Sequence, residues 1–469
     1  MTNWKNVGNR CAAQVGEVLE YKAKMSVSFK LKIKNFGSIR QGYLNPETDD
    51  FFSVSKCNVF IGNQGTGKST IIKLISTFLW LEKALIRGDF TLETLNKSLF
   101  ITKYLAYHCI DSYLENDTEI IFLTNAYSFK YQNQQFVVEK RQESVHYIKP
   151  KISYIPAERN FISALKNPTA VKGLPHNLFD LINDFYEASN ALNKDWFDLP
   201  VAPFKYRYDS LTRKSFVSDK KESFENELYQ TASGVQSVTP LALVTKHNAY
   251  SVLRNDVSNQ THQNYTFDEL KKIQQDFQRK TVQLSSEVLQ NQFYVYLNAN
   301  NPWLYNFYIS NSIIKNQQLQ KFKESNSEKE AEILKVLEYG IDAVLDSCFI
   351  NIVEEPEQNL FPRSQIEVVK FLVSCLNQKS HNALFMTTHS PFILNALNNY
   401  IYAEKISSKT IPNKLYVSAK QCTAYLLQDG KIIDIFDRDV GLIDTTIIDD
   451  CATLLNEQFD SLYQQEIEK

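Results

Sequence analysis

A glycine-rich loop early in the chain has the residue types and spacing that bind phosphate. It reads Gly-Asn-Gln-Gly-Thr-Gly-Lys-Ser-Thr over residues 62–70 and matches the pattern G-x-x-x-x-G-K-[ST]. Glycines let consecutive backbone N–H groups curl around a phosphate at a helix N-terminus. The spacing predicts that Lys68 contacts the β- and γ-phosphates of a nucleotide and that the Ser69 hydroxyl binds Mg²⁺. The predicted nucleotide contacts in the loop are Asn63, Gly65, Thr66, Gly67, Lys68, Ser69 and Thr70.

Two neighbouring carboxylates follow an apolar run later in the chain. Residues 349–353 read Phe-Ile-Asn-Ile-Val, and Glu354 and Glu355 come directly after them. In phosphoryl-transfer ATPases one such acid holds Mg²⁺ and the next orients or deprotonates the attacking water. We therefore expect Glu354 to be the metal-side acid, where aspartate is more usual, and Glu355 to be the catalytic base. The alternative is a solvated acidic loop.

A histidine follows another apolar run. Met386 to Pro391 read Met-Thr-Thr-His-Ser-Pro, in which Ser390 suits the N-cap of a helix and Pro391 its first position. A histidine at the carboxyl end of a strand can sense the γ-phosphate of a nucleotide. We predict this catalytic role for His389, and the alternative is a purely structural histidine.

Alternating strands and helices are predicted to position these residues. Residues 26–33 alternate apolar and polar side chains, which is the period of a half-buried strand. Residues 58–61 form a short apolar run ending at the loop, and apolar residues then recur at helical spacing over 71–79. Strand patterns return at 348–353 and 383–386. This alternation predicts an α/β fold.

The middle and the end of the chain differ in composition from the rest. Residues 167–345 are polar and rich in Asn, Gln and Lys, with amphipathic stretches that predict a helical insertion, including a short coiled-coil hairpin near 270–288. Residues 429–469 carry eleven acids and three bases. We therefore expect an N-terminal head lobe at 1–165, a helical insertion at 166–345, a C-terminal head lobe at 346–428 and an acidic tail at 429–469.

The overall composition excludes several classes of protein. The 469 residues are 43% hydrophobic and 22% charged, which is ordinary for globular domains. The net charge is −2, so removing the tail's −8 leaves about +6, which permits contact with DNA without arguing for it. Seven scattered cysteines, no apolar signal segment and no run of 18 apolar residues predict a cytoplasmic protein with no membrane segment.

Four segments together resemble the heads of ABC-type ATPases. They are the 62–70 loop, Ala-Ser-Gly-Val-Gln at 232–236, Glu-Glu-Pro-Glu-Gln-Asn-Leu-Phe-Pro at 354–362, and Thr-His-Ser-Pro at 388–391. The chain is most similar to the RecF/SMC-like and OLD-like ATPases of bacterial antiphage defence. The block at 354–362 and the segment Tyr-Ile-Pro-Ala-Glu-Arg at 154–159 look most like the PtuA ATPase of Septu and related retron systems.

The resemblance implies an α/β, ABC-type P-loop ATPase head with a helical insertion domain, which hydrolyses ATP with Mg²⁺. It implies that Ser233, Gly234 and Gln236 form the signature motif, which binds the γ-phosphate of ATP held by the opposite protomer. The motif is usually Leu-Ser-Gly-Gly-Gln, and this chain departs from it. The resemblance places Arg159 near the Q-loop glutamine, and a surface salt bridge is the alternative for this residue.

The resemblance also implies partners. It predicts a homodimer or a higher even oligomer with composite ATP sites, which regulates a separate nuclease effector, with an HNH-type nuclease favoured, in antiphage defence. One alternative is a RecF/SMC-like repair ATPase that binds DNA directly. Another is a scaffold that is gated by ATP and turns it over slowly.

Overall fold

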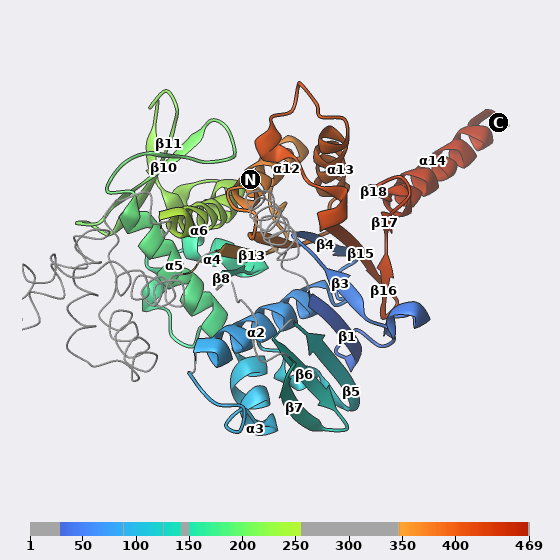
Figure 1. The fold of residues 1–469 in the computed structure, drawn as a ribbon. Helices are drawn as coiled ribbons and strands as arrows, with labels where there is room; N and C mark the ends of the chain where they lie inside the picture. Colours follow the sequence, from blue (N-terminus) through green and yellow to red (C-terminus); the bar gives the residue numbers. More distant parts are fainter. Residues whose placement is uncertain are drawn as a thin grey trace, which may run out of the picture. The chain divides into compact units, whose positions relative to one another are not determined.

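The computed structural model describes residues 29–87, 89–124, 126–141, 150–254, 346 and 348–467 (Figure 1). The chain divides into two compact units, of which the first comprises residues 1–146, 152–248 and 350–469. The second comprises 147–151 and 249–349, and most of it falls outside the described residues. All the site residues discussed below belong to the first unit.

A seven-stranded sheet carries the phosphate-binding loop. Its order is β2-β16-β15-β4-β14-β13-β8, and the neighbouring strands β15, β4, β14 and β13 are parallel to one another. The loop, His389 and Glu355 follow the carboxyl ends of β4, β14 and β13, so they meet at one edge of the sheet. The strands are β2 (Gly42–Tyr43), β16 (Lys431–Asp434), β15 (Cys422–Gln428), β4 (Cys57–Gly62), β14 (Ala383–Thr388), β13 (Cys348–Glu354) and β8 (Pro150–Ile155).

A second, antiparallel sheet has the order β3-β1-β5-β6-β7. The strand predicted near the start of the chain is its β1, in which Phe29, Leu31 and Ile33 are buried at every second position. This alternation arises because successive side chains of a strand point to opposite faces. The strands are β3 (Phe52–Val54), β1 (Phe29–Phe36), β5 (Leu114–Leu123), β6 (Tyr127–Gln132) and β7 (Gln135–Lys140).

Helices connect and cover these sheets. The helix predicted after the phosphate loop is α2, which begins at Lys68, and Ser390 caps α13 by accepting the N–H of Phe392. The longer helices are α2 (Lys68–Arg87), α5 (His176–Ala191), α6 (Ser233–Arg254), α12 (Pro362–Leu376), α13 (Pro391–Lys405) and α14 (Thr446–Ile467). Shorter ones are α3 (Lys97–Leu99), the π-helix η2 (Phe100–Leu105) and α4 (Asn160–Ala164), together with single 3₁₀ turns.

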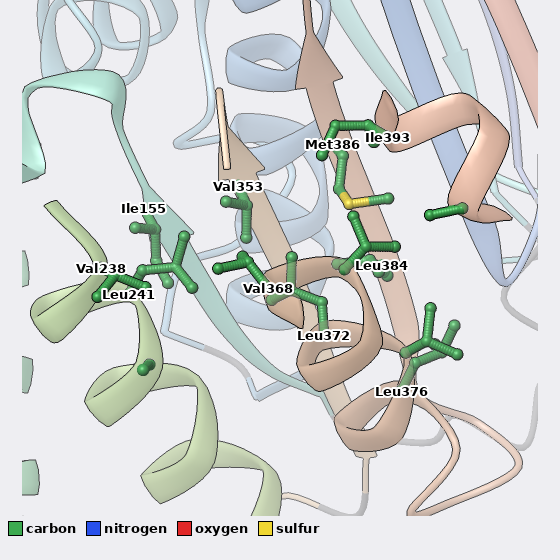
Figure 2. Packing of buried hydrophobic residues seen from close by; sticks show 14 of the residues in the cluster. Ile155, Val238, Leu241, Val353, Val368, Leu372, Leu376, Leu384, Met386 and Ile393 are labelled. Atoms are coloured by element: carbon green, nitrogen blue, oxygen red, sulfur yellow. The ribbon is translucent and has the colours of Figure 1, made fainter. Parts of the chain in front are cut away.

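The seven-stranded sheet separates two apolar clusters. In β14, Leu384 and Met386 belong to one cluster, while Phe385 between them belongs to the other. The first cluster contains residues of α6, α12 and α13, and Figure 2 shows Val238 and Leu372 beside the sheet residues. The second contains residues of α2 and of the antiparallel sheet. Burial on both faces holds the central strands, and therefore the strand ends that carry the site, in fixed positions.

The prediction of a helical insertion is wrong for part of residues 166–345. A four-stranded antiparallel sheet lies there, with the order β12 (Glu225–Glu227), β11 (Lys214–Asp219), β10 (Phe204–Asp209) and β9 (Phe197–Asp198). Its physical basis is the alternation within β10, where Tyr206 and Tyr208 are buried and Arg207 between them is less so. The predicted coiled-coil hairpin near 270–288 lies outside the described residues.

The start predicted for the acidic tail is also wrong. Residues 431–434 form β16, which pairs with β15 through a two-residue turn at Asp429 and Gly430. Both turn residues have positive φ, 51° and 75°, as a tight hairpin turn of this kind requires. The buried Ile432 ties this hairpin to the core, so the head continues past residue 428, and α14 follows only from Thr446.

Among the described residues, no helix is both long enough and apolar enough to cross a membrane.

Candidate functional site

The phosphate-binding loop has the backbone conformation that its glycines permit. Gly65 and Gly67 have φ of 75° and 102°, values that side chains disfavour. A Cβ on Gly67 would also lie 2.7 Å from Cγ1 of Ile39, so no larger residue fits there without movement. The loop leads directly into α2, whose first N–H groups and positive dipole end favour an anion. The predicted contacts Asn63, Thr66 and Thr70 lie in the same loop and in the first turn of α2.

Lys68 is folded back over the loop. Its Nζ donates to the carbonyl oxygens of Gly62, at 2.8 Å, and Asn63, at 2.7 Å. The residue is 5% exposed, and burial lowers the pKa of its ammonium, while Glu355 and other nearby glutamates oppose that shift. The ammonium therefore lies inside the loop, where a phosphate bound by the backbone amides would meet it.

Ser69 and Glu354, the residues predicted to hold Mg²⁺, lie in hydrogen-bond contact. The Ser69 hydroxyl donates to Glu354 Oε2 at 3.1 Å, and the Tyr154 hydroxyl donates to Glu354 Oε1. Hydroxyl and carboxylate oxygens are the ligands that Mg²⁺ prefers, so these residues fit that ion. Burial raises the pKa of Glu354, and the charge of Lys73 and the two hydrogen bonds oppose the rise.

His389 bridges Lys68 and Glu355. Its Nδ1 lies 3.5 Å from Lys68 Nζ, and its Nε2 lies 3.3 Å from Glu355 Oε1. Because an ammonium can only donate, this arrangement favours the tautomer in which Nδ1 accepts and the Nε2–H donates to the carboxylate. The Glu355 backbone has φ of 44°, a left-handed value that is uncommon for a non-glycine residue, and its N–H donates to the Thr387 carbonyl at 3.0 Å. The strand ends thus hold the predicted base and the predicted phosphate sensor together.

A third glutamate joins the loops after β13 and β14. Glu357 Oε1 accepts the backbone N–H of His389 at 2.6 Å and the hydroxyl of Thr388 at 2.8 Å. Its Oε2 is buried with no hydrogen-bond partner among the described residues. Burial raises the pKa of Glu357, and the hydrogen bond from the His389 N–H opposes the rise.

Arg159 is fully buried beneath the acidic loop. Its guanidinium donates to the carbonyl oxygens of Glu354, at 2.6 Å, Glu355, at 2.7 Å, and Ser237, at 3.1 Å. Burial lowers its pKa to about 10, so the group keeps its charge at neutral pH. The surface salt bridge considered for this residue is therefore wrong, because the guanidinium ties the end of β13 to α6 from inside the head.

The predicted signature residues lie at the start of α6. Ser233 is exposed, and Gly234 packs so closely that an added Cβ would lie 2.7 Å from the carbonyl oxygen of Asn359. The side-chain amide of Gln236 donates to the carbonyls of Tyr229 and Thr231, both at 3.0 Å, and so holds the turn before the helix. Of the three predicted signature residues, Ser233 is thus the one that is exposed to solvent.

The structure brings together five of the residues predicted from sequence: Lys68, Ser69, Glu354, Glu355 and His389. Ser233, Gly234 and Gln236 lie on a separate element and contact other neighbours. Sequence analysis missed the roles of Tyr154 and Glu357, although both stand in segments already quoted, Tyr154 two residues before Pro156 and Glu357 directly after Pro356. The residues that Tyr154 and Glu357 contact are distant in sequence, so no local pattern predicts these contacts.

No protein-family model and no curated protein matches this chain. Solved structures that match include the SMC head domain from Thermotoga maritima, with 8% identity, 87% of this chain and 98% of that chain covered, and a TM-score of 0.33. An SMC head bound to the C-terminal winged-helix domain of ScpA has 9% identity, 87% and 97% coverage, and a TM-score of 0.31.

A third match is an Smc head domain with an extended coiled coil, bound to the C-terminal domain of ScpA and derived from Pyrococcus furiosus. It has 11% identity, 92% and 99% coverage, and a TM-score of 0.27. These scores are low, so the strand order and the position of the phosphate loop decide the fold. On those grounds the α/β fold predicted from sequence, with its phosphate-binding loop at the end of a central parallel strand, is confirmed.

Proposed function

We propose that the protein is an ABC-type ATPase that hydrolyses ATP with Mg²⁺ at the carboxyl edge of the seven-stranded sheet. The observation that carries the proposal is the row formed by Lys68, His389 and Glu355, which joins the phosphate loop to the predicted base. Backbone amides of residues 62–70 and Lys68 bind the β- and γ-phosphates. Ser69 and Glu354 hold Mg²⁺, which neutralises phosphate charge when bound.

In the hydrolytic step, Glu355 accepts a proton from a water molecule as the water oxygen attacks the γ-phosphorus. The bond between that phosphorus and the bridging oxygen breaks, and the products are ADP and phosphate. The His389 Nε2–H orients the Glu355 carboxylate from one side, and its Nδ1 contacts Lys68 on the phosphate side.

We propose further that the site is completed by Ser233 and Gly234 of a second copy, which gives an ATP-dependent dimer or a higher even oligomer. The exposure of Ser233 at the N-terminus of the 22-residue helix α6 supports this, because such an end can receive a phosphate. Each chain supplies one phosphate loop and one Ser233, so two copies would form two composite sites.

The oligomer test uses light scattering of Glu355→Gln with saturating ATP and Mg²⁺. This variant keeps the shape of the side chain but removes the base, so the ATP-bound dimer should accumulate. Adding Ser233→Arg should return the protein to monomer, whereas Ser210→Arg, on the exposed turn between β10 and β11, should leave the dimer intact. A monomer in all three proteins would refute the composite site.

The role in the cell follows from the resemblance of the sequence motifs. We propose that the ATP-bound oligomer controls a separate nuclease, of HNH type, in antiphage defence. The test is coexpression with the product of the adjacent reading frame and a nuclease assay with and without ATP. A nuclease whose activity is the same with the wild type and with Lys68→Ala would contradict control by ATP.

A slow ATP-gated scaffold is a second candidate, and one contact supports it. Glu354 is longer than the usual aspartate, and Tyr154 and Ser69 donate to its two carboxylate oxygens, which leaves the side chain less free to adjust to a metal ion. Equal turnover by the wild type and Glu355→Gln would favour the scaffold over the hydrolase.

A further inference from the structure

A cavity of about 690 Å³ lies in the first unit, formed by α4, α5, the sheet β10–β12 and the turns between them. This volume is within the range of sites that bind small molecules. None of the residues assigned to the ATP site lines it. The proposed ATPase activity therefore leaves the cavity without a role.

Aromatic side chains form much of the cavity wall. Tyr186, Tyr208 and Tyr229 line it, together with the buried Phe185. The rings of Tyr186 and Tyr208 are 5.8 Å apart and inclined at 60°, so they present an edge and a face rather than a closed stack. Aromatic walls of this kind bind planar rings by stacking and edge contacts.

The cavity also has an excess of positive charge. Lys166, Arg213 and Lys214 line it with a single acid, Glu227, whose Oε1 lies 2.6 Å from Lys214 Nζ. Neither Lys166 nor Arg213 forms an ion pair within the part of the chain that the structure describes. Lys166 and Arg213 can therefore pair with a ligand, and their positive charge favours an anionic one.

Hydrogen-bonding groups complete the wall. Ser163 is 1% exposed, and its hydroxyl has no hydrogen-bond partner among the described residues. The amide of Asn190 lines the same cavity. A buried hydroxyl without a partner destabilises the folded protein, so a ligand with polar ring atoms that reached it would recover part of that free energy.

We propose that this cavity binds a nucleotide, with the base among the tyrosines and the phosphate at Lys166 and Arg213. A planar polar ring joined to a phosphate satisfies the aromatic wall, the hydroxyl and the two unpaired cations together. The ligand is either a free mononucleotide or a nucleotide unit of single-stranded nucleic acid, which share this chemistry. The site is separate from the phosphate loop, so it does not depend on the proposed ATPase activity.

The test measures binding by calorimetry to the full chain carrying Lys68→Ala, which disables the phosphate loop. The probes are AMP, CMP, adenosine, ribose 5-phosphate and a ten-nucleotide oligothymidylate. We expect AMP or CMP to bind at one site, and adenosine and ribose 5-phosphate, which each lack half of the recognised groups, to bind at least tenfold more weakly. Tighter binding of the oligonucleotide than of the mononucleotides would identify nucleic acid as the source.

Variants of the wall separate this site from nonspecific attraction. Lys166→Ala and Arg213→Asn should each weaken binding about tenfold, because each removes a charged hydrogen bond. Asparagine suits position 213 because the backbone there has φ of 56°. Lys172→Ala removes the same charge from an exposed position outside the cavity and should have no effect.

Absence of binding by every probe, or an equal loss in Lys172→Ala, would overturn the proposal. If Lys68→Ala does not fold, AMP binding to the wild type saturated with ATP answers the same question. Binding that persists under ATP supports a second site, whereas complete competition by ATP refutes it.

Discussion

The backbone N–H of His389 donates to Glu357 Oε1 at 2.6 Å, although the two residues follow different strands of the sheet. This hydrogen bond fixes the turn that aims the His389 ring at Lys68 and Glu355. Glu357 itself forms no hydrogen bond with the phosphate loop among the described contacts; its hydrogen bonds at the site go to His389 and Thr388, and its charge raises the pKa of Lys68.

Glu357→Ala should lower kcat about tenfold or more while leaving the ATP dissociation constant unchanged. The reason is that the loss of a hydrogen bond to a carboxylate, about 1.5–3 kcal/mol, releases His389, while the hydrogen bonds from Lys68 to the loop carbonyls remain. Glu357→Gln keeps a carbonyl acceptor at Oε1 and should retain most of the activity. Steady-state kinetics with a separate nucleotide-binding assay checks this. Equal loss in both variants would argue against a positioning role.

Lys68→Ala should abolish ATP binding at the loop. The side chain is buried over the two carbonyls that shape the loop, so its removal takes away both the charge and the contacts that hold the loop closed. Binding of a fluorescent ATP analogue measures the effect, and Lys103→Ala, which removes an exposed lysine on η2, serves as the control. Unchanged affinity in Lys68→Ala would refute the assignment of the loop.

Arg159→Ala should destabilise the head by about 3–5 kcal/mol, since it leaves buried carbonyls of Glu354, Glu355 and Ser237 without their donor. Arg40→Ala is the matched control, because it breaks an exposed pair with Glu115 that is worth at most about 1 kcal/mol. Denaturant unfolding of both variants checks the difference. Similar losses would show that Arg159 has no special structural role.

Gly234→Ala should lower stability by about 1–3 kcal/mol, because its Cβ would meet the Asn359 carbonyl at 2.7 Å and the backbone there must shift. Thermal unfolding of the monomer tests it. A melting temperature equal to that of the wild type would show that the loop at residue 359 adjusts freely.

Glu82→Gln should change how stability depends on pH. Glu82 is buried in α2, and burial raises the pKa of its carboxyl from 4.5 to about 7, while a hydrogen bond with Thr124 opposes the shift. The folded state therefore holds a proton that the unfolded state loses above about pH 4.5. The stability of the wild type falls as the pH rises from about 4.5 to 7, by up to about 3 kcal/mol.

The side chain of the Glu82→Gln variant resembles the protonated carboxyl group. Because it cannot lose a proton, the variant does not lose stability as the pH rises. The two proteins should unfold at similar denaturant concentrations at pH 4.5, and the variant should be the more stable above pH 7. The comparison is a difference between two proteins, so other titrating groups cancel. A difference that stays constant between pH 4.5 and 8 would contradict the raised pKa.

Much of the head was predictable because its signals are local. The apolar run at residues 58–61, the glycines and the helical spacing after them lie within about twenty residues of one another and are found as β4, the loop and α2. The four-stranded sheet was missed although β10 alternates aromatic and charged residues in the sequence Phe-Lys-Tyr-Arg-Tyr-Asp. The polar composition of the surrounding region outweighed that short alternation.

The sequence by itself determined the phosphate loop, the acids after one strand and the histidine after another, because each is a short pattern tied to the end of an element. Only the tertiary structure decided which residues meet. Lys68 and His389 are 321 positions apart, and Tyr154 and Glu354 are 200 apart. Burial of the parallel strands on both faces fixes these pairs, since it sets which strand ends are neighbours, and no local pattern records that order.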